Sequence, residues 1–466
     1  FTRGSTNVIK TGKCYHFIGI GGTGMSGLAK VMLDRGMTIS GSDLHDNKEV
    51  AQLKEAGASV YLGHDARLLH DNLDGVIVSS AIGEENAELK AARRRNLPVV
   101  KRLHALASLL YGYKSIGIAG THGKTTTTAM AATILTATGQ DPSYLIGAQC
   151  PGLGGNSHLG QGSFFVTEVD ESDGLFLTLR PTIAVLNNIG RDHLNTYSTL
   201  AGIKRGFAQY IRQSELSVLA IDNPNVRELA REVPNAFTVG ICEDAKLSAT
   251  NIAHHGFRTN FDLVYQGKRV CSVQLPAPGS HNVRNALCAI GACFLAGISL
   301  TEAARALEEF CLPKRRFQLL EENGVTVVDD YAHLPEEIEA TLQAIRDGWN
   351  HRRIVAIFQP HRYSRTKAIS GEFGNAFRKA DTVLLTPIYP AREQPIPGIT
   401  SRLIAAAISN SSNLDLHFVE DKEKVVSFLK GYIEPGDFII SFGAGDIWTV
   451  TEELSCFLEK GQFCTV

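Results

Sequence analysis

The 466-residue sequence lacks the features that mark several classes of protein. Its formal net charge is only −2, so no basic excess predicts a nucleic-acid groove or a polybasic membrane patch. No stretch approaches about 18 consecutive apolar residues, and no charged segment followed by an apolar run opens the chain. We therefore expect a cytoplasmic protein that binds neither nucleic acid nor membrane.

Cysteine pairing is also absent from the sequence. The nine cysteines are scattered, with no C-x-x-C pair and no metal-ligand spacing, which suits a reducing compartment. Cys288 and Cys293 lie in one apolar, helix-forming stretch and look like small core residues. We find no internal repeat and no low-complexity tract in the sequence.

The most informative stretch that is present covers residues 115–135. An apolar run, 115–119, ends in glycines and is followed by Gly-Lys-Thr at 123–125 and by a segment that can be helical. Backbone N–H groups of such a loop surround phosphate oxygens, the lysine adds a positive charge, and the hydroxyl can bind Mg²⁺. The strict pattern G-x-x-x-x-G-K-[ST] is not met, because Ile118 takes the place of its first glycine and Gly120 gives the shorter loop G-x-x-G-K-T. We predict a nucleotide-phosphate site, with a Gly-rich strand-to-helix turn as the alternative.

A second glycine cluster lies near the N-terminus. Residues 14–24 read as an apolar strand that enters glycines, and G-x-G-x-x-G fits in two registers, from Gly19 and from Gly22. Asp43 ends the next strand, about 20 residues on, where a ribose-binding acid is expected. By itself the motif suggests NAD, but any ligand with a pyrophosphate, or a tight turn without a ligand, is compatible with it.

Alternating apolar runs and helical segments predict three α/β domains. We expect a Rossmann-like parallel sheet in residues 1–113, a P-loop ATPase-like domain with a β insertion at 248–276 in residues 114–313, and a Rossmann-like domain in residues 314–466. Strands are expected near 37–40, 75–82, 97–101, 164–169, 182–187, 216–221, 325–328, 354–358, 382–385 and 437–442.

Candidate metal ligands follow two apolar strands of the central domain. Glu168 ends the first of these strands, and a carboxylate at a strand end near a phosphate loop is a natural Mg²⁺ ligand. Asp170 and Asp173 follow it and could instead belong to a solvated acidic loop. His193 follows the second strand and could bind a second Mg²⁺, position a phosphate or be structural.

Charged residues also follow strands of the third domain. Asp330 and Tyr331 come after one strand, and Arg362 and Arg365 come after another. If this segment is helical, the two arginines lie on one face and can clamp a carboxylate, although a basic surface turn is the alternative. Arg316, at the end of a predicted linker, could reach a phosphate when the domains close.

Six motifs together resemble the Mur ligase family, which builds the peptide stem of bacterial cell-wall precursors, and the resemblance covers nearly the whole chain. They are Gly-Thr-His-Gly-Lys-Thr-Thr at 120–126, Glu-Val-Asp-Glu-Ser-Asp at 168–173, His-Asn-Val-Arg-Asn-Ala at 281–286, Arg-Arg-Phe at 315–317, Asp-Asp-Tyr-Ala-His at 329–333 and Phe-Gln-Pro-His-Arg-Tyr-Ser-Arg-Thr at 358–366. The glycine cluster at 19–27 and the string Pro-His-Arg-Tyr-Ser-Arg look most like the members that attach L-alanine to UDP-N-acetylmuramic acid.

The resemblance implies an ATP- and Mg²⁺-dependent ligase that works through an acyl phosphate, with UDP-N-acetylmuramic acid and L-alanine as substrates. It implies that the UDP-sugar contacts Gly21, Gly22, Thr23, Gly24, Met25, Ser26, Asp43 and Ser80. It implies that ATP contacts Gly120, Thr121, Gly123, Lys124, Thr125, Thr126, Asn285, Asp330 and Tyr331. Mg²⁺ would be held by Thr125, Glu168 and His193, the alanine carboxylate by Arg362 and Arg365, and catalysis would depend on Lys124, Glu168, His193 and Arg316.

Two positions depart from the family pattern. Leu334 stands where members of this subgroup usually have a second histidine, and Lys204 is out of register with the lysine that some members carbamylate. Three alternatives remain: the sibling ligase that attaches a whole tripeptide, an NAD-dependent oxidoreductase built on the first glycine cluster, and a sensor of nucleotide or UDP-sugar without catalysis. The sequence is compatible with a monomer or a homodimer.

Overall fold

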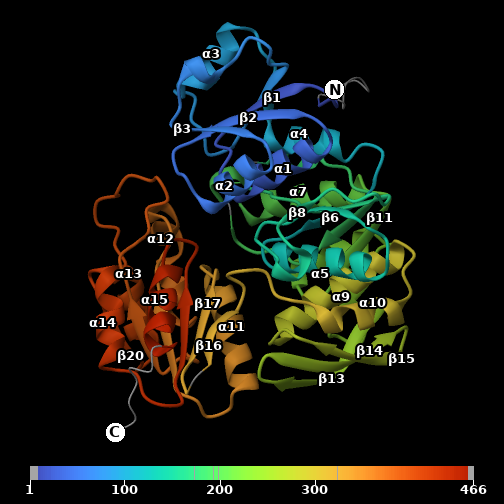
Figure 1. The fold of residues 1–466 in the computed structure, drawn as a ribbon. Helices are drawn as coiled ribbons and strands as arrows, with labels where there is room; N and C mark the ends of the chain where they lie inside the picture. The colour runs from blue at the N-terminus through green and yellow to red at the C-terminus, as the bar shows by residue number, and fades with distance from the viewer. Residues whose placement is uncertain (1–8, 173, 193, 198, 323, 460–466) are drawn as a thin grey trace. The chain divides into compact units, whose positions relative to one another are not determined.

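The computed structural model describes residues 9–459 apart from 173, 193, 198 and 323 (Figure 1). Its strands form three sheets of five, ten and six strands, each with helices beside it. The three α/β domains predicted from the sequence are thereby confirmed, while their limits at 113/114 and 313/314 stay predictions. Two compact units contain these sheets: residues 1–251, 261–273 and 283–310 form the first, and residues 252–260, 274–282 and 311–466 form the second.

The N-terminal sheet is parallel, in the order β3-β2-β1-β4-β5. Alternate residues of β1 face its two sides: Phe17 lies in one apolar cluster with side chains of α1 and α4, and Ile18 lies in another with Leu89 of α3. This period of two is the strand pattern expected for a sheet covered on both faces. The elements are β1 (Cys14–Ile18), α1 (Thr23–Asp34), β2 (Thr38–Asp43), α2 (Lys48–Glu55), β3 (Ser59–Leu62), β4 (Gly75–Val78), α3 (Ala87–Arg94), β5 (Val99–Lys101) and α4 (Arg102–Leu109).

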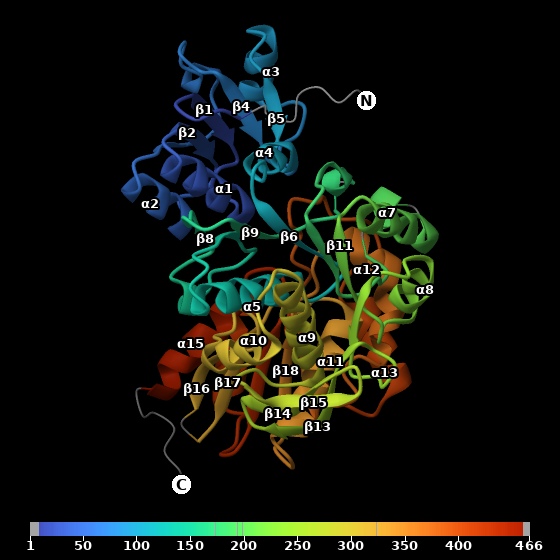
Figure 2. The ribbon, with the colours of Figure 1, turned by 90° about the vertical axis from the view of Figure 1, so that its right-hand side faces the viewer.

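The central sheet is mixed, in the order β15-β14-β13-β12-β11-β10-β6-β9-β7-β8. Strands β6, β9 and β11 are labelled in Figure 2. Strand β6 lies between β10 and β9 and is parallel to both, so the ends of these three strands meet at one edge. The predicted β insertion is confirmed as β13 to β15. The strands are β6 (Lys114–Ala119), β7 (Ser143–Leu145), β8 (Ser157–His158), β9 (Phe164–Glu168), β10 (Ile183–Leu186), β11 (Leu216–Ala220), β12 (Phe237–Gly240), β13 (Leu247–His255), β14 (Arg258–Tyr265) and β15 (Lys268–Leu275). The helices are α5 (Lys124–Ala137), α6 (Leu194–Tyr197), α7 (Leu200–Arg212), α8 (Pro224–Glu232), α9 (Ser280–Leu295) and α10 (Leu300–Ala306).

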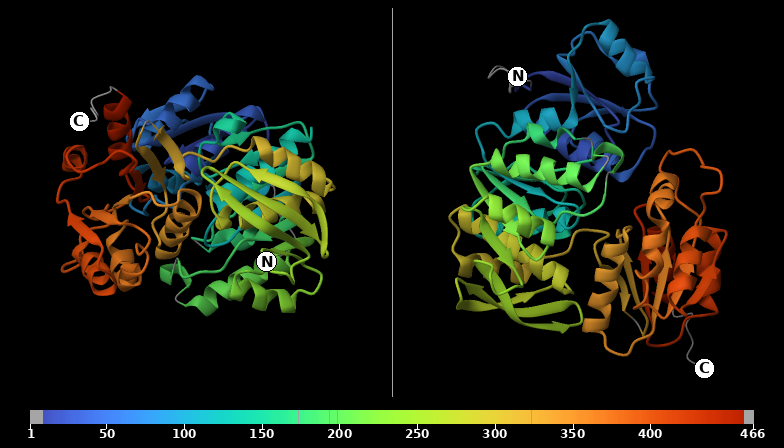
Figure 3. Two further views of the ribbon diagram at one scale, coloured as in Figure 1. Left: turned by 90° about the horizontal axis from the view of Figure 1, so that it is seen from below. Right: turned by 180° about the vertical axis from the view of Figure 1, so that it is seen from behind.

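The C-terminal sheet has the order β16-β17-β21-β18-β19-β20, with β16 antiparallel to its neighbour and the other pairs parallel. Helices lie on both faces of it (Figure 3). Phe358 belongs to the cluster on the side of α11 and α13, and Ile357 to the cluster on the side of α14 and α15. The elements are β16 (Gln318–Glu322), β17 (Thr326–Asp330), α11 (Pro335–Gly348), β18 (Ile354–Phe358), α12 (Tyr363–Ile369), β19 (Thr382–Leu385), α13 (Arg402–Ser411), β20 (Asp415–Phe418), α14 (Val425–Lys430), β21 (Phe438–Phe442) and α15 (Trp448–Glu459). Among the described residues, no helix combines the length and the apolar character needed to cross a bilayer.

Candidate active site

The predicted phosphate loop connects β6 to α5. Gly120 and Gly123 have φ values of +133° and +78°, a region of backbone conformation that favours glycine. A Cβ atom on Gly123 would also collide with the side-chain oxygen of Asn285, so this position is closed to larger residues. Ile118 is fully buried inside β6, which explains why the usual first glycine is missing: the loop begins only after this strand ends.

Two asparagines after β10 hold the loop in shape. Asn188 accepts a hydrogen bond from the amide of His122 at 2.8 Å through its Oδ1 atom and donates to the carbonyl of His122 at 3.1 Å. Asn187 donates to the hydroxyl of Thr127 at 2.9 Å, and the hydroxyl of Thr121 accepts from the amide of Gly190 at 2.8 Å. Neither asparagine was among the predicted site residues, because each is held to the loop by contacts with residues at least 60 positions away.

Lys124 is held inside the loop by three oxygen atoms. Its Nζ donates to the carbonyls of Gly120 at 2.6 Å and Thr121 at 3.3 Å, and it forms an ion pair with Glu171 at 3.0 Å. Burial by itself would lower the pKa of Lys124, but the carboxylates of Glu171, Asp170 and Glu168 raise it above its usual value. Burial raises the pKa of Glu171 to about 7. The lysine is therefore a cation held at the loop, and Glu171 is a partner that the sequence analysis missed.

Thr125 and Glu168 lie together beside the loop, as the predicted metal site requires. The Thr125 hydroxyl donates to Glu168 Oε2 at 2.8 Å, and Thr126 is buried in the same turn of α5. A Cβ atom on Gly147 would collide with Glu168 Oε1, so this glycine leaves room for the carboxylate. His193, the third predicted ligand, lies outside the described residues, as does Asp173. Within the described part of the chain, no three His, Cys, Asp or Glu side chains gather as a metal site.

The glycine turn of the N-terminal sheet is closed by the end of β2. The carbonyl of Ser42 accepts the amides of Gly19 at 2.9 Å and Ile20 at 3.1 Å, and Asp43 Oδ2 accepts the amide of Gly21 at 2.9 Å. Asp43 is therefore a structural residue of this turn, and its contact with a uridine stays a prediction.

Helix α1 begins at Thr23, directly after Gly22. The first amides of a helix have no partner within it and can receive an anion. The amides of Met25 and Ser26 instead donate to the carbonyl of Gly22, and both residues are buried. The diphosphate contact predicted for Gly21 to Ser26 stays a prediction, as does the contact of Ser80, which is exposed after β4.

A small pocket lies between Gly24 and the carboxylate of Glu168, and all of its lining belongs to the first unit. Its walls include Thr23 and Gly24 of α1, Arg102 of α4, Ile146, and Thr167 and Glu168 of β9. Arg102 forms an ion pair with Asp170 at 3.1 Å, and a Cβ atom on Gly24 would lie 2.9 Å from its Nη1 atom. Arg102 was not among the predicted site residues, because a single arginine at a helix start belongs to no motif.

In the second unit, Arg316 and Arg315 both lie over the ring of Tyr331, at 5.0 and 5.1 Å from its centre. Arg315 is tied to Asp329 and to the carbonyls of Gly443 and Gly445, so its role is structural.

Asp330 lies at the end of β17 and shapes the backbone on both sides of it. Its two oxygens accept the amides of Phe317 at 2.9 Å and Ala332 at 2.7 Å, and burial raises its pKa to about 6. A carboxylate can accept further hydrogen bonds beyond these two, so the predicted adenosine contact stays compatible with this geometry.

The predicted pair Arg362 and Arg365 does not share a helical face. Arg362 precedes α12 with φ of +75°, and only Arg365 lies within the helix. Arg365 Nη1 lies 3.1 Å from Nδ1 of His361, whose pKa is lowered to about 3, mainly by burial. A neutral His361 can accept this bond and orient Arg365.

Leu334 is buried in the core of this unit, so an apolar residue suits that position.

Comparisons with known proteins agree with this architecture. Three family models match in sequence: the Mur ligase family catalytic domain over residues 14–114, the Mur ligase middle domain over 118–293, and the Mur ligase glutamate ligase domain over 315–445. The chain is 43% identical over 450 residues to a UDP-N-acetylmuramate–L-alanine ligase of Syntrophotalea carbinolica, covering 96% of this chain and 98% of the relative. It is 45% identical to the enzyme of the same name from Geotalea uraniireducens, and the match covers 94% of this chain and 96% of that relative.

Solved structures show the same similarity. The UDP-N-acetylmuramate-alanine ligase of Thermotoga maritima superposes with a TM-score of 0.83 at 28% identity, covering 96% of this chain and 99% of that one. A murein peptide ligase of Psychrobacter arcticus gives a TM-score of 0.70 at 25% identity, and the match covers 98% of this chain and 100% of that one.

Proposed function

This chain belongs to the Mur ligase family, and we propose that it is the ATP-dependent ligase that joins L-alanine to the carboxylate of UDP-N-acetylmuramic acid. The observation that carries this proposal is identity of 43–45% over nearly the full length to relatives of that name. The small pocket beside Gly24 and Glu168 supports it, because residues of the proposed diphosphate site and of the proposed metal site both line it.

The reaction needs alignment and charge neutralisation rather than a protein nucleophile. A carboxylate oxygen of the sugar attacks the γ-phosphorus of ATP, the bond to the β,γ-bridging oxygen breaks, and ADP leaves. The amine of alanine then attacks the carbonyl carbon of the acyl phosphate, loses a proton, and expels inorganic phosphate.

Each group of residues has a part in this scheme. Lys124 leaves Glu171 and neutralises the phosphates of ATP, while the amides of the loop surround them. Arg316 is assigned to the γ-phosphate of ATP. Contacts with the adenosine are assigned to Asn285, Asp330 and Tyr331. Arg362 and Arg365 hold the alanine carboxylate, which leaves the amine free to attack.

The residues beside the loop also fit Mg²⁺, because hydroxyl and carboxylate oxygens are the ligands that it prefers. Thr125 and Glu168 are already within 2.8 Å of each other, and His193 is proposed as the ligand of a second ion. When bound, Mg²⁺ would neutralise charge on the phosphates.

The glycine turn holds the UDP part of the sugar, and this replaces NAD as the expected ligand of that turn.

A phosphate-release assay tests the proposal. The protein is incubated with UDP-N-acetylmuramate, ATP and Mg²⁺, and then with L-alanine, glycine, L-serine or the tripeptide. We expect release that depends on the amino acid and is fastest with L-alanine. Equal or faster turnover with the tripeptide would assign the chain to the sibling ligase, and no release with any acceptor would favour a sensor.

A further inference from the structure

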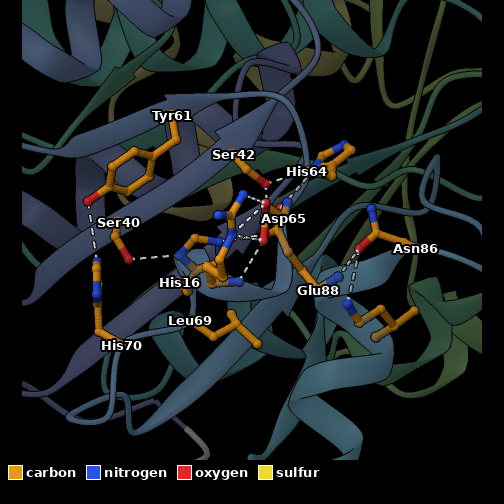
Figure 4. Close-up of polar contacts among 12 residues, drawn as sticks. His16, Ser40, Ser42, Tyr61, His64, Asp65, Leu69, His70, Asn86 and Glu88 are labelled. Atoms are coloured by element: carbon orange, nitrogen blue, oxygen red, sulfur yellow. Dashed lines mark hydrogen bonds and ion pairs between the residues drawn. The ribbon is translucent and has the colours of Figure 1, made fainter.

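A network of buried polar side chains lies on the α3 side of the N-terminal sheet (Figure 4). Glu88 and His16 are both completely buried, and Glu88 Oε2 lies 2.8 Å from His16 Nε2. The other ring nitrogen of His16 lies 2.8 Å from the hydroxyl of Ser40. Burying such groups is unfavourable unless all of them are paired. The presence of this polar network inside the domain therefore needs an explanation.

The remaining contacts of Glu88 reach the ends of two strands. The hydroxyl of Ser42, in β2, donates to Glu88 Oε2 at 2.8 Å. The amide of Asp65, beyond β3, donates to Glu88 Oε1 at 3.0 Å. The Nδ1 atom of His64 lies 3.2 Å from Glu88 Oε1 and 2.8 Å from the Ser42 hydroxyl. Figure 4 shows these side chains converging on one carboxylate.

Ser42 connects the network to the glycine turn. Its hydroxyl is bound to Glu88, while its carbonyl accepts the amides of Gly19 and Ile20. The next residue, Asp43, accepts the amide of Gly21. A shift of β2 at Ser42 would therefore move the backbone that precedes Gly22 to Gly24.

We propose that Glu88 is a positioning residue for UDP-sugar binding, which holds Ser42 and the turn at His64–Asp65 so that the glycine turn keeps its ligand-binding shape. Its carboxylate lies inside the domain and reaches the turn only through these residues. The identity of the ligand rests on the proposed function.

The variant Glu88→Gln tests this role, because it keeps the size of the side chain and removes its charge. One carboxylate oxygen then becomes an amide NH2 group, so either Ser42 and His16 at the Oε2 position or the amide of Asp65 at the Oε1 position loses its acceptor. We expect the Kd for UDP-N-acetylmuramate, measured by titration calorimetry, to rise about tenfold. The KM for ATP and the kcat at saturating UDP-sugar should stay within about twofold, since Lys124 begins helix α5, which follows strand β6 of the central sheet. An unchanged Kd would overturn the proposal.

Leu89→Ala is the matched control. Leu89 is the next residue of α3, is 3% exposed and belongs to the apolar cluster of this face, so its truncation destabilises the domain without removing a polar contact. We expect it to leave the Kd within about twofold. An equal rise in both variants would show that general loosening of the domain is the cause and would overturn the proposal.

Ser42→Ala covers the case in which Glu88→Gln does not fold by circular dichroism. It removes one hydroxyl, and we expect a smaller rise in the Kd, about threefold; no rise would overturn the proposal. Direct binding separates this inference from the proposed function. Wild-type protein that binds the UDP-sugar but releases no phosphate with L-alanine would refute only the proposed function, whereas protein that does not bind it would refute both.

Discussion

Replacing Lys124 with methionine tests the central contact of the phosphate loop. Its Nζ lies 3.0 Å from Glu171 Oε1, and the side chains are 18% and 3% exposed. At that separation the attraction is about 5 kcal/mol for an effective dielectric constant of 20, although burial of the two charges offsets much of it. Removing one partner of a buried pair typically costs about 3–5 kcal/mol, because the other charge is left unpaired. We expect the free energy of unfolding to fall by about 3 kcal/mol, near the lower end of this range. The reason is that Glu171 can take up a proton when Lys124 is absent.

The loss should depend on pH. Burial raises the pKa of Glu171 to about 7 in the folded protein, against 4.5 ordinarily, and loss of the nearby cation raises it further. A carboxyl group whose folded pKa is raised contributes stability that is present below its unfolded pKa and is lost as the pH rises through the folded value. The melting temperature of Lys124→Met should therefore fall further below that of the wild type at about pH 8 than at about pH 6.

The double variant Lys124→Met, Glu171→Gln is the matched control, because it buries neither charge. We expect it to recover most of the stability lost by the single variant. For a domain of roughly 200 residues, a loss of 3 kcal/mol corresponds to a fall of about 6–12 °C in the melting temperature of the transition that ATP shifts.

Activity gives the second measurement. Both variants should lose at least about 100-fold in kcat, because they lack the cation that neutralises the transferred phosphoryl group, while the Kd for the UDP-sugar stays unchanged. A double variant no more stable than the single one would refute the buried pair. Turnover by Lys124→Met above about a tenth of wild type would refute the role of the lysine in phosphoryl transfer.

Three further outcomes follow from the site. Glu168→Gln should raise the Mg²⁺ concentration for half-maximal phosphate release about tenfold, because it removes an anionic oxygen beside the Thr125 hydroxyl; an unchanged Mg²⁺ requirement would exclude it as a ligand. Arg102→Ala should raise the KM for the UDP-sugar about tenfold and leave the KM for ATP unchanged, since the arginine lines the pocket beside the glycine turn. Arg365→Ala should raise the KM for L-alanine at least about tenfold, while the exposed Arg378→Ala serves as the control; equal effects of the two would argue against a carboxylate clamp.

Most of the fold could be predicted from the sequence, because short apolar runs that end in glycine, proline or polar residues are typical of buried strands. The strands expected at 115–119 and 354–358 are confirmed as β6 and β18. Short strands were missed, such as β3, β8, β12 and β20 with two to four residues each, and β3, β8 and β20 lie at the edges of their sheets. Their pairing with a neighbour, rather than their own pattern, makes them strands.

The C-terminal site shows where a local pattern misleads. The spacing of Arg362 and Arg365 predicts one helical face, but the helix begins only at Tyr363. Arg362 takes a left-handed backbone conformation and donates its amide to the carbonyl of Tyr389 at 2.8 Å. Contact with a segment remote in sequence therefore overrides the helical spacing of the motif.

The sequence by itself determined the phosphate loop. Its glycines, lysine and hydroxyl lie within a few residues of one another and can be recognised in the sequence, while Asn187 and Asn188 from beyond β10 complete its hydrogen bonds. Only the tertiary structure decided which charges meet there: Glu171 is 47 residues from Lys124, and Asp170 is 68 residues from Arg102. These pairings depend on how parallel strands align and on how far the folded domain excludes water from the charges. Neither property can be predicted from a local stretch of sequence.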